Sequence, residues 1–309
     1  MKKAFIIIIG ILLLAACRPA TKDIRAQDFR YGTEGLAIRF VPNLPPFRLF
    51  DNEDFNAVIE VENRGTFTIG QGGDKIYISG FDPSIITGIS TYGEQLSLLE
   101  GRDVYKPQGD VDTVAFKGRV QYLKQKKIDR YPTTILATAC YTYETVATAN
   151  MCLDPNPYSA TIKQRVCTPG AVSLGGGQGA PIAVTTVEED ASPGRARFKI
   201  HIQNAGKGEV FRYGLQYLGK CSPYSEGLAF DESGYVQLAD IMIAGVSIKS
   251  SCKPLDVDHI RLDQSGSAVI YCSLDSVRGQ AAFVSPLTVI LRYGYRDSTY
   301  TNIEIIPSS

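Results

Sequence analysis

The two histidines are the side chains of this 309-residue chain that could supply the base of a Ser-His-Asp arrangement. A serine nucleophile would need one of them within reach. His201 lies in a stretch that alternates apolar and polar residues, which favours a solvent-facing strand position. His259 lies beside the carboxylates Asp256 and Asp258, as a loop residue would, and no Gly-x-Ser-x-Gly motif is present. We therefore expect no catalytic residue.

Oxygen ligands for a metal ion occur in three acidic loops, at residues 51–54, 109–112 and 188–190. None of these loops follows the Asp-x-Asp-x-Asp-Gly pattern that ends in glutamate. Thiol ligands are no better placed, because the sequence has no Cys-x-x-Cys pair. The glycine-rich run 174–181 lacks the Lys-Ser/Thr of a phosphate-binding loop and is interpreted as a turn between domains. The sequence therefore predicts no metal and no other cofactor.

Charge and composition exclude further classes of protein. The 32 Lys and Arg residues balance 32 Asp and Glu residues, whereas nucleic-acid binding needs a basic surface that displaces phosphate counterions. Hydrophobic residues make up 44% of the chain, which is enough to build a core and excludes a disordered tail. We therefore expect a globular protein without a nucleic-acid partner.

The N-terminal residues form a positively charged start followed by an apolar run. Met1-Lys2-Lys3 precedes the uncharged residues 4–16, which are too few to span about 30 Å of hydrocarbon as a helix. This pattern is typical of a signal peptide over residues 1–16. The run ends in Leu14-Ala15-Ala16-Cys17, which resembles the lipobox of prokaryotic lipoproteins.

The lipobox resemblance implies that the peptide is cleaved before Cys17 and that the Cys17 thiol carries lipid. The mature chain would then be extracytoplasmic and attached to the membrane by its N-terminus. Residues 17–34 are polar and aperiodic, so we interpret them as a lipidated tether. If Cys17 is lipidated, six of the seven cysteines remain, an even number suited to three disulfides in an oxidising compartment.

Behind the tether, short alternating stretches separated by Gly, Pro, Asp and Asn predict β-strands. Residues 55–62, 198–202 and 267–272 show this period of two. Helical periodicity is scarce, and residues 238–243 are the best candidate for a short helix. The sequence therefore predicts an all-β fold.

Two motifs occur twice in the same order, which indicates a duplication. A strand that ends in Asn-x-Gly occurs at residues 59–65 and again at 200–206. Tyr-x-Tyr occurs at residues 141–143 and again at 293–295. We therefore expect two tandem antiparallel β-sandwiches, each ending in a tyrosine-rich hairpin. Their predicted ranges are 35–160 and 181–309, with a linker over 161–180, and the glycine of each Asn-x-Gly motif is expected to tolerate positive φ.

The strand with Asn-x-Gly resembles the CARDB-type and related immunoglobulin-like modules of prokaryotic surface proteins. This resemblance implies immunoglobulin-like sandwiches. With the lipobox, it predicts a lipid-anchored surface protein that acts as a binding, adhesion or envelope-assembly module, with an envelope protein or polysaccharide as its partner. Two alternatives remain open: a surface hydrolase that acts on polysaccharide or peptide through loop carboxylates, and a structural spacer.

The six cysteines behind the tether are expected to form disulfides. Cys140 and Cys152 fall on the two predicted arms of the first copy's last hairpin, opposite each other if both hairpins share one register. We therefore predict a Cys140–Cys152 disulfide. Three pairings remain open for the other four, which are Cys167, Cys221, Cys252 and Cys272.

Overall fold

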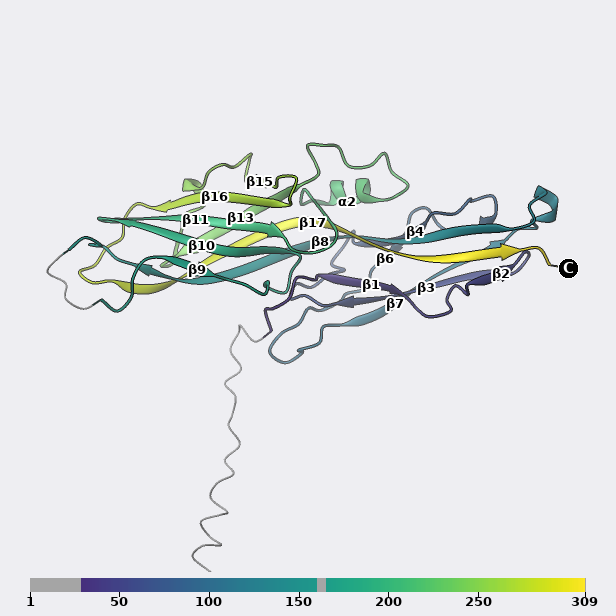
Figure 1. Ribbon diagram of the computed structural model, residues 1–309, viewed down its shortest axis with the longest axis horizontal. Helices are drawn as coiled ribbons and strands as arrows, with labels where there is room; N and C mark the ends of the chain where they lie inside the picture. Colours follow the sequence, from purple (N-terminus) through teal and green to yellow (C-terminus); the bar gives the residue numbers. More distant parts are fainter. Residues whose placement is uncertain (1–28, 160–164, 309) are drawn as a thin grey trace, which may run out of the picture.

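The computed structural model describes residues 29–159 and 165–308. The predicted signal peptide, Cys17 and most of the predicted tether lie outside these residues. The described chain is nearly all β, which confirms the predicted fold class, and it forms an elongated body of two lobes placed end to end (Figure 1). No helix within the described residues is long and apolar enough to cross a membrane.

Two long strands, β8 (Tyr131–Leu153) and β17 (Phe283–Ile306), form the spine of the molecule. They pair antiparallel along their length, from Tyr131 opposite Ile305 to Leu153 opposite Phe283. At about 3.3 Å per residue a strand of this length spans about 75 Å, which is why both strands run through both lobes (Figure 1). Each lobe is therefore built on one half of each long strand.

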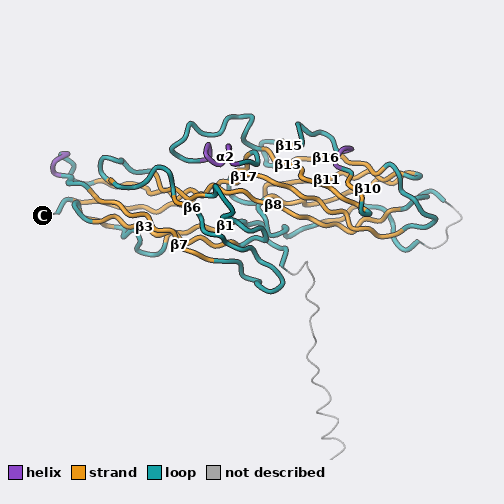
Figure 2. The backbone as a smooth tube through the Cα atoms, turned by 180° about the vertical axis from the view of Figure 1, so that it is seen from behind, coloured by secondary structure: helices purple, strands orange, loops and turns teal. Residues whose placement is uncertain are grey.

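The remaining strands divide between the lobes, as the strand-coloured tube also shows (Figure 2). The N-terminal lobe contains β1 (Leu36–Phe40), β2 (Arg48–Phe50), β3 (Asp54–Asn63), β4 (Lys75–Ser79), β5 (Ile86–Thr87), β6 (Glu94–Gln95) and β7 (Val111–Val120). The C-terminal lobe contains β9 (Ala171–Ser173), β10 (Ile182–Ser192), β11 (Arg195–Asn204), β12 (Glu209–Phe211), β13 (Tyr235–Ile243), β14 (Val246–Ser247), β15 (His259–Arg261) and β16 (Ser267–Leu274).

Each lobe is a sandwich of a small four-stranded sheet and one end of a shared nine-stranded sheet. The small sheets have the strand orders β1-β3-β7-β5 and β16-β11-β10-β9, and the shared sheet contains β8 and β17. The strands pack in two layers because their buried and exposed side chains alternate. In β3, every second residue from Phe55 to Asn63 is buried. One continuous hydrophobic core runs through both lobes.

The predicted domain ranges do not separate two self-contained sandwiches. The last residues of β17, Glu304–Ile306, pair with β2 of the N-terminal lobe. Within the predicted linker, β9 pairs with β10 and belongs to the C-terminal lobe. The predicted tyrosine-rich hairpins are also absent from the described chain, because Tyr141 and Tyr143 lie in the middle of the single strand β8. The two copies therefore exchange strand halves across a shared centre.

That centre is a cluster of four fully buried tyrosines. Tyr143 lies opposite Tyr293 and Tyr141 opposite Tyr295, so the two Tyr-x-Tyr motifs pair with each other. The rings of Tyr141 and Tyr295 are 5.9 Å apart between centroids, and those of Tyr143 and Tyr293 are 6.3 Å apart. Ring contacts at these separations stabilise beyond the area they bury.

Each Asn-x-Gly motif receives one of these tyrosines. The Tyr143 hydroxyl donates to Asn63 Oδ1 at 3.3 Å, and the Tyr295 hydroxyl donates to Asn204 Oδ1 at 2.9 Å. The expected role of the glycines is wrong, since neither Gly65 nor Gly206 has positive φ. A Cβ at Gly65 would overlap the Tyr143 hydroxyl, so the glycine is needed for close approach instead.

The predicted short helix at residues 238–243 is also wrong, because these residues belong to β13. The α-helix of the described chain is α2 (Leu215–Cys221), which packs beside β8 at the junction of the lobes (Figure 2). Single-turn 3-10 helices lie at Lys124–Lys126 and Lys249–Ser251. Because the apolar run of β13 is short, its length fits a buried strand as well as a helix.

The three disulfides do not include the predicted Cys140–Cys152 pair. Both cysteines lie on the continuous strand β8, where twelve residues of extended chain separate them by about 40 Å. Cys140 instead bonds to Cys221 of α2, and Cys152 bonds to Cys167. The remaining pair is Cys252–Cys272, so all six cysteines expected to form disulfides do so.

Candidate functional site

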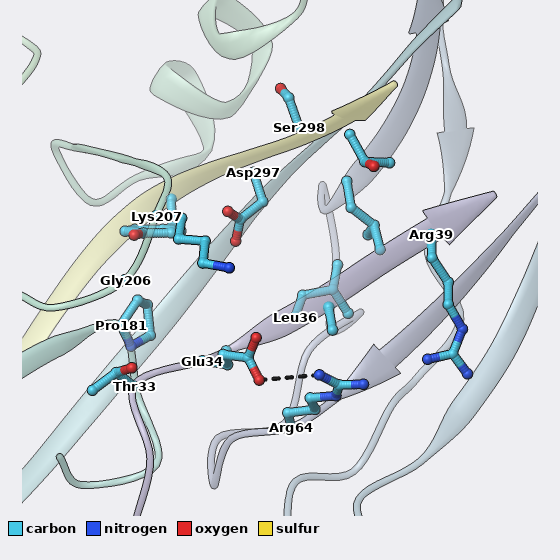
Figure 3. A pocket seen from close by; sticks show the side chains of 15 residues that line it. Thr33, Glu34, Leu36, Arg39, Arg64, Pro181, Gly206, Lys207, Asp297 and Ser298 are labelled. Carbon is cyan, nitrogen blue, oxygen red and sulfur yellow. Dashed lines mark hydrogen bonds and ion pairs between the residues drawn. The ribbon is translucent and has the colours of Figure 1, made fainter. Parts of the chain in front are cut away.

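A groove lies between β1 and β17 where the two lobes meet, with a cavity volume of about 350 Å³ (Figure 3). We call it the junction groove. Residues from both lobes line it: Thr33, Glu34, Gly35, Leu36, Ala37, Ile38, Arg39, Arg64, Pro181, Gly206, Lys207, Tyr295, Asp297, Ser298 and Thr299. Pro181, Gly206 and Lys207 come from the second copy of the repeat, and β1 comes from the first. The groove therefore forms only when both copies of the chain are folded together.

Asp297 is a partly buried carboxylate in the lining of the junction groove. The buried Tyr141 hydroxyl donates to Asp297 Oδ2 at 2.9 Å. Burial raises the pKa of Asp297 to about 6; the Glu34 carboxylate adds to the increase, whereas the hydrogen bond from Tyr141 and the Lys207 ammonium oppose it. The Asp297 carboxyl therefore changes between its protonated and ionised forms near pH 6. The side chain faces the cavity (Figure 3).

The other charged groups around the groove largely neutralise one another. Arg64 Nη1 lies 3.2 Å from Glu34 Oε2, and Arg64 Nε lies 2.9 Å from Glu62 Oε2. Arg39 forms an ion pair with Glu60. The Lys207 side chain extends between Asp297 and Glu34 in Figure 3. The groove is therefore polar but balanced in charge, which suits an uncharged ligand with hydrogen-bonding groups.

A second feature of the site is an unpaired stretch of the β17 backbone. On the side of β17 opposite β8, β12 pairs with residues 294–296 and β2 pairs with residues 304–306. Across 297–303, no strand of the described chain takes this position. The junction groove begins at this gap, so backbone hydrogen-bonding groups as well as side chains are available to a ligand.

The histidines do not come together with a serine nucleophile. His201 Nε2 on β11 lies 2.6 Å from Glu188 Oε1 on β10. His259, expected in a loop, is the first residue of the short strand β15, and its Nδ1 lies 2.8 Å from the Val257 carbonyl oxygen. Neither ring contacts a serine side chain in the residues that the structure describes. Both histidines belong to the C-terminal lobe and do not line the junction groove.

The three acidic stretches make structural contacts, and residues 188–190, expected in a loop, lie within the strand β10. Asp51 accepts hydrogen bonds from the backbone N–H groups of Leu123 and Ser308, which ties the C-terminus to the N-terminal lobe. Asp110 pairs with Lys106, with 2.6 Å between Oδ1 and Nζ. Glu188 pairs with Lys199 as well as His201. Within residues 29–159 and 165–308, no group of three or more His, Cys, Asp or Glu side chains could hold a metal ion.

Asp297 was missed from the sequence, although the repeat contains a signal for it. The repeat offset of 152 places Asp297 at the position of Thr145 in the first copy. The Thr145 hydroxyl contacts the Tyr293 hydroxyl at 2.9 Å, as Asp297 contacts that of Tyr141. An acid therefore takes the place of a neutral residue at one of two equivalent positions, and it gives the groove a carboxyl whose pKa is raised to about 6.

Glu189 is a second carboxyl with a raised pKa, and with Asp297 it predicts a pH dependence of stability. Burial raises the pKa of Glu189 to about 7, and the nearby Asp154 adds to the increase. Above about pH 4 to 5 these two carboxyls have lost their protons in the unfolded chain. In the folded state they keep them until the pH approaches the raised pKa values. Folding binds protons in this range, so we expect these groups to reduce stability as pH rises from about 4.5 to 7.

Glu189→Gln should weaken this fall in stability, measured as the free energy of unfolding in urea at pH 5 and pH 7.5. Asp263→Asn serves as the control, since hydrogen bonds from Ser265 and Ser267 lower the pKa of Asp263 and place its titration below this range. A pH dependence unchanged by Glu189→Gln would show that the carboxyl does not titrate as its burial requires.

The sequence matches no protein-family model and no curated protein with which it was compared. Among solved structures it is similar to the secreted serine protease VesC from Vibrio cholerae, with 10% identity, a TM-score of 0.20, and 86% of this chain and 51% of the protease covered. Red sea bream transglutaminase gives 10% identity, a TM-score of 0.17 and coverage of 91% and 32%. The collagen adhesin CNA of S. aureus gives 9%, 0.13, 91% and 93%.

This chain spans about half the length of the protease and about a third of the transglutaminase. All three TM-scores are far below the level at which two folds correspond. These similarities therefore carry no argument about function, which rests on the groove alone.

Proposed function

We propose that this chain is a lipid-anchored, extracytoplasmic binding module that holds its ligand in the junction groove. The observation that carries the proposal is the groove itself: it is concave, it is lined by both copies, and it combines a partly buried carboxyl with unpaired backbone groups. Sites of this kind, with a few polar groups placed on rigid strands, are suited to recognition.

The position of the tether supports attachment close to the groove. Thr33 and Glu34 line the groove and lie 16 and 17 residues after Cys17. An extended chain of this length spans at most about 55 to 60 Å, so a lipid on Cys17 would keep the ligand near the membrane surface. Three disulfides are compatible with an oxidising compartment outside the cytoplasm.

Filling the groove tests the binding function. The Thr299 side chain lies on the inward face of β17, so Thr299→Tyr would occupy the cavity, whereas Asn302→Tyr adds the same ring at an exposed position of the same strand that does not line the groove. The full chain is immobilised and offered purified envelope polysaccharide and detergent-solubilised envelope proteins. We expect the unmodified chain and Asn302→Tyr to retain the same component, and Thr299→Tyr to bind it at least tenfold more weakly.

If the unmodified chain retained no component, the result would favour the structural spacer. If it cleaved the polysaccharide or the proteins, the result would favour the surface hydrolase. Equal retention by all three chains would place the ligand outside the groove. The anchor is tested separately by fractionating cells: Cys17→Ser should release the chain from the membrane fraction. A Cys17→Ser chain that stays in the membrane would contradict lipidation at this residue.

A further inference from the structure

The chain enters the folded body at the junction of the two lobes. Gly32 N–H donates to the Gly176 carbonyl oxygen of the C-terminal lobe at 2.7 Å. In the N-terminal lobe, Arg102 Cζ lies 4.3 Å from the centroid of the Tyr31 ring, and the Arg102 guanidinium donates to the Tyr31 carbonyl oxygen. The entry point is therefore fixed to both lobes. Residues 17–28, which precede it, span at most about 40 Å when extended.

The loop between β6 and β7 lies beside this entry point. Arg102 belongs to the loop, and Val104 and Tyr105 follow it within about 11 Å of extended chain. The loop lies on the side of the body where the described chain begins, whereas the loop between α2 and β13 lies on the opposite side (Figures 1 and 2). A lipid on Cys17 would therefore bring the first of these two loops toward the membrane.

The β6–β7 loop ends in a tight turn with two exposed side chains. Asp103 Oδ1 accepts hydrogen bonds from the N–H groups of Tyr105 at 2.7 Å and Lys106 at 2.6 Å, and Asp103 N–H donates to the Lys106 carbonyl oxygen at 3.0 Å. Val104 and Tyr105, which we call the loop tip, occupy the central positions and are 38% and 95% exposed. Turns favour Gly, Pro, Asn, Asp and Ser, so a valine and a tyrosine here point to contact with a less polar environment.

The charges around the loop tip leave little net attraction for an anionic surface. Lys106 Nζ lies 3.0 Å from Glu100 Oε2 and 2.6 Å from Asp110 Oδ1. Residues 100–110 contain two basic and three acidic side chains, which gives a net charge of −1. Binding of this loop to a bilayer would therefore come from burial of the loop tip and not from attraction to anionic lipids.

We propose that the loop tip is a second membrane contact, at which Val104 and Tyr105 enter the headgroup region of the bilayer that holds the lipid anchor. The inference rests on the proposed anchor and names the surface of the body that faces the lipid. Tyrosine is enriched at membrane–water interfaces because its ring is apolar and its hydroxyl is polar. A contact of two side chains is weak by itself, but a short tether raises its effective concentration to the millimolar range.

This contact would also set the position of the junction groove relative to the bilayer. Thr33, Glu34 and Arg64 line the junction groove, and they also line the hollow behind the β6–β7 loop together with Arg102 and Pro107. The groove and the loop therefore share a wall. A bilayer in contact with the loop tip keeps the groove, and any ligand in it, next to the lipid surface.

A tryptophan reporter tests the contact, because the chain contains no tryptophan. The six cysteines that the structure describes form disulfides, so the chain from Cys17 onward can be coupled through the Cys17 thiol to maleimide lipid in phosphatidylcholine vesicles. Compared with unbrominated vesicles, brominated phosphatidylcholine should quench the emission of Tyr105→Trp at least twofold. Phe230→Trp is the matched control, since Phe230 is 80% exposed in the loop on the opposite side, and it should lose less than a tenth of its emission.

A pair of valine substitutions tests whether the loop tip itself enters the lipid. In the Tyr105→Trp chain, Val104→Asp should reduce the quenching by at least half, because burial of an unpaired carboxylate is costly. Val246→Asp makes the same change at an exposed valine of the C-terminal lobe and should leave the quenching unchanged. Replacing a third of the phosphatidylcholine with phosphatidylglycerol should change the quenching by less than a fifth, since the loop carries no positive net charge.

Three results would overturn the membrane contact. These are equal quenching of Tyr105→Trp and Phe230→Trp, no quenching of either, and quenching that requires phosphatidylglycerol. Coupling through maleimide lipid replaces the natural lipid, so the outcome is independent of the Cys17→Ser fractionation. A coupled chain without quenching rejects the contact and leaves the proposed function standing, whereas a Cys17→Ser chain that stays in the membrane removes the anchor on which the inference rests.

Discussion

Replacing Ile303 with aspartate is expected to unfold the N-terminal lobe, although residue 303 belongs to the second copy of the repeat. Ile303 is 2% exposed and lies opposite Thr133, in the half of β17 that completes the N-terminal lobe. A carboxylate at this position would have no buried partner, and an uncompensated buried charge costs about 3 to 5 kcal/mol. Two separate tandem sandwiches would instead predict damage to the C-terminal lobe alone.

Hydrogen exchange distinguishes these outcomes. We expect faster exchange in β3 and β7 of the N-terminal lobe, together with a lower midpoint of urea unfolding for the whole molecule, because one core joins the lobes. Asn302→Asp is the matched control: it makes the same side chain at the neighbouring exposed position and should change stability by less than about 0.5 kcal/mol. Faster exchange confined to β10 and β11 would contradict the shared-strand architecture.

Removing the Cys140–Cys221 disulfide is expected to cost more stability than removing either of the others. The bond closes a loop of 81 residues, which corresponds to about 4.5 kcal/mol from the lost entropy of the unfolded chain. The Cys252–Cys272 bond closes 20 residues and corresponds to about 3 kcal/mol. The first bond also holds α2, a helix of seven residues that is too short to form alone.

The comparison uses Cys140→Ala with Cys221→Ala, and Cys252→Ala with Cys272→Ala as the matched pair. Free energies of unfolding in urea should fall further for the first pair, and its variant should lose protection at α2. In the first variant, Tyr77, Phe211 and Leu218 stay packed only through apolar contact around the former bond. A larger loss for the second pair would show that loop length does not govern these bonds.

Local pattern in the sequence is sufficient for the all-β fold and for the positions of many strands. The alternation in residues 55–62 predicts β3, because one face of a strand must be buried and the other exposed. Pattern fails for residues 238–243, since a short apolar run fits a buried strand and a helix equally well. It also fails for α2, whose seven residues are held by a disulfide and by contacts with distant strands rather than by an amphipathic repeat.

The candidate site is less accessible to sequence reasoning than the fold. The histidines and acidic loops attract attention by residue type, yet each of those described finds a nearby structural partner: His201 with Glu188, for example, and Asp51 with Leu123 and Ser308. Asp297 is a single acid in a polar strand, and its importance comes from burial against Tyr141. The burial of Asp297 and the unpaired backbone of β17 depend on which distant segments pack beside this strand. The residues of the strand alone do not encode that information.

The sequence by itself determined the strand periodicity, the repeated motifs and the even set of six cysteines behind the predicted tether. Tertiary structure alone decided how the copies join. A duplicated Tyr-x-Tyr motif is compatible with two hairpins and with two long strands that pair with each other, because both satisfy the same local alternation. Pairing of Tyr143 with Tyr293 selects the second arrangement. That choice separates Cys140 from Cys152, exchanges strand ends between the lobes and creates the junction groove.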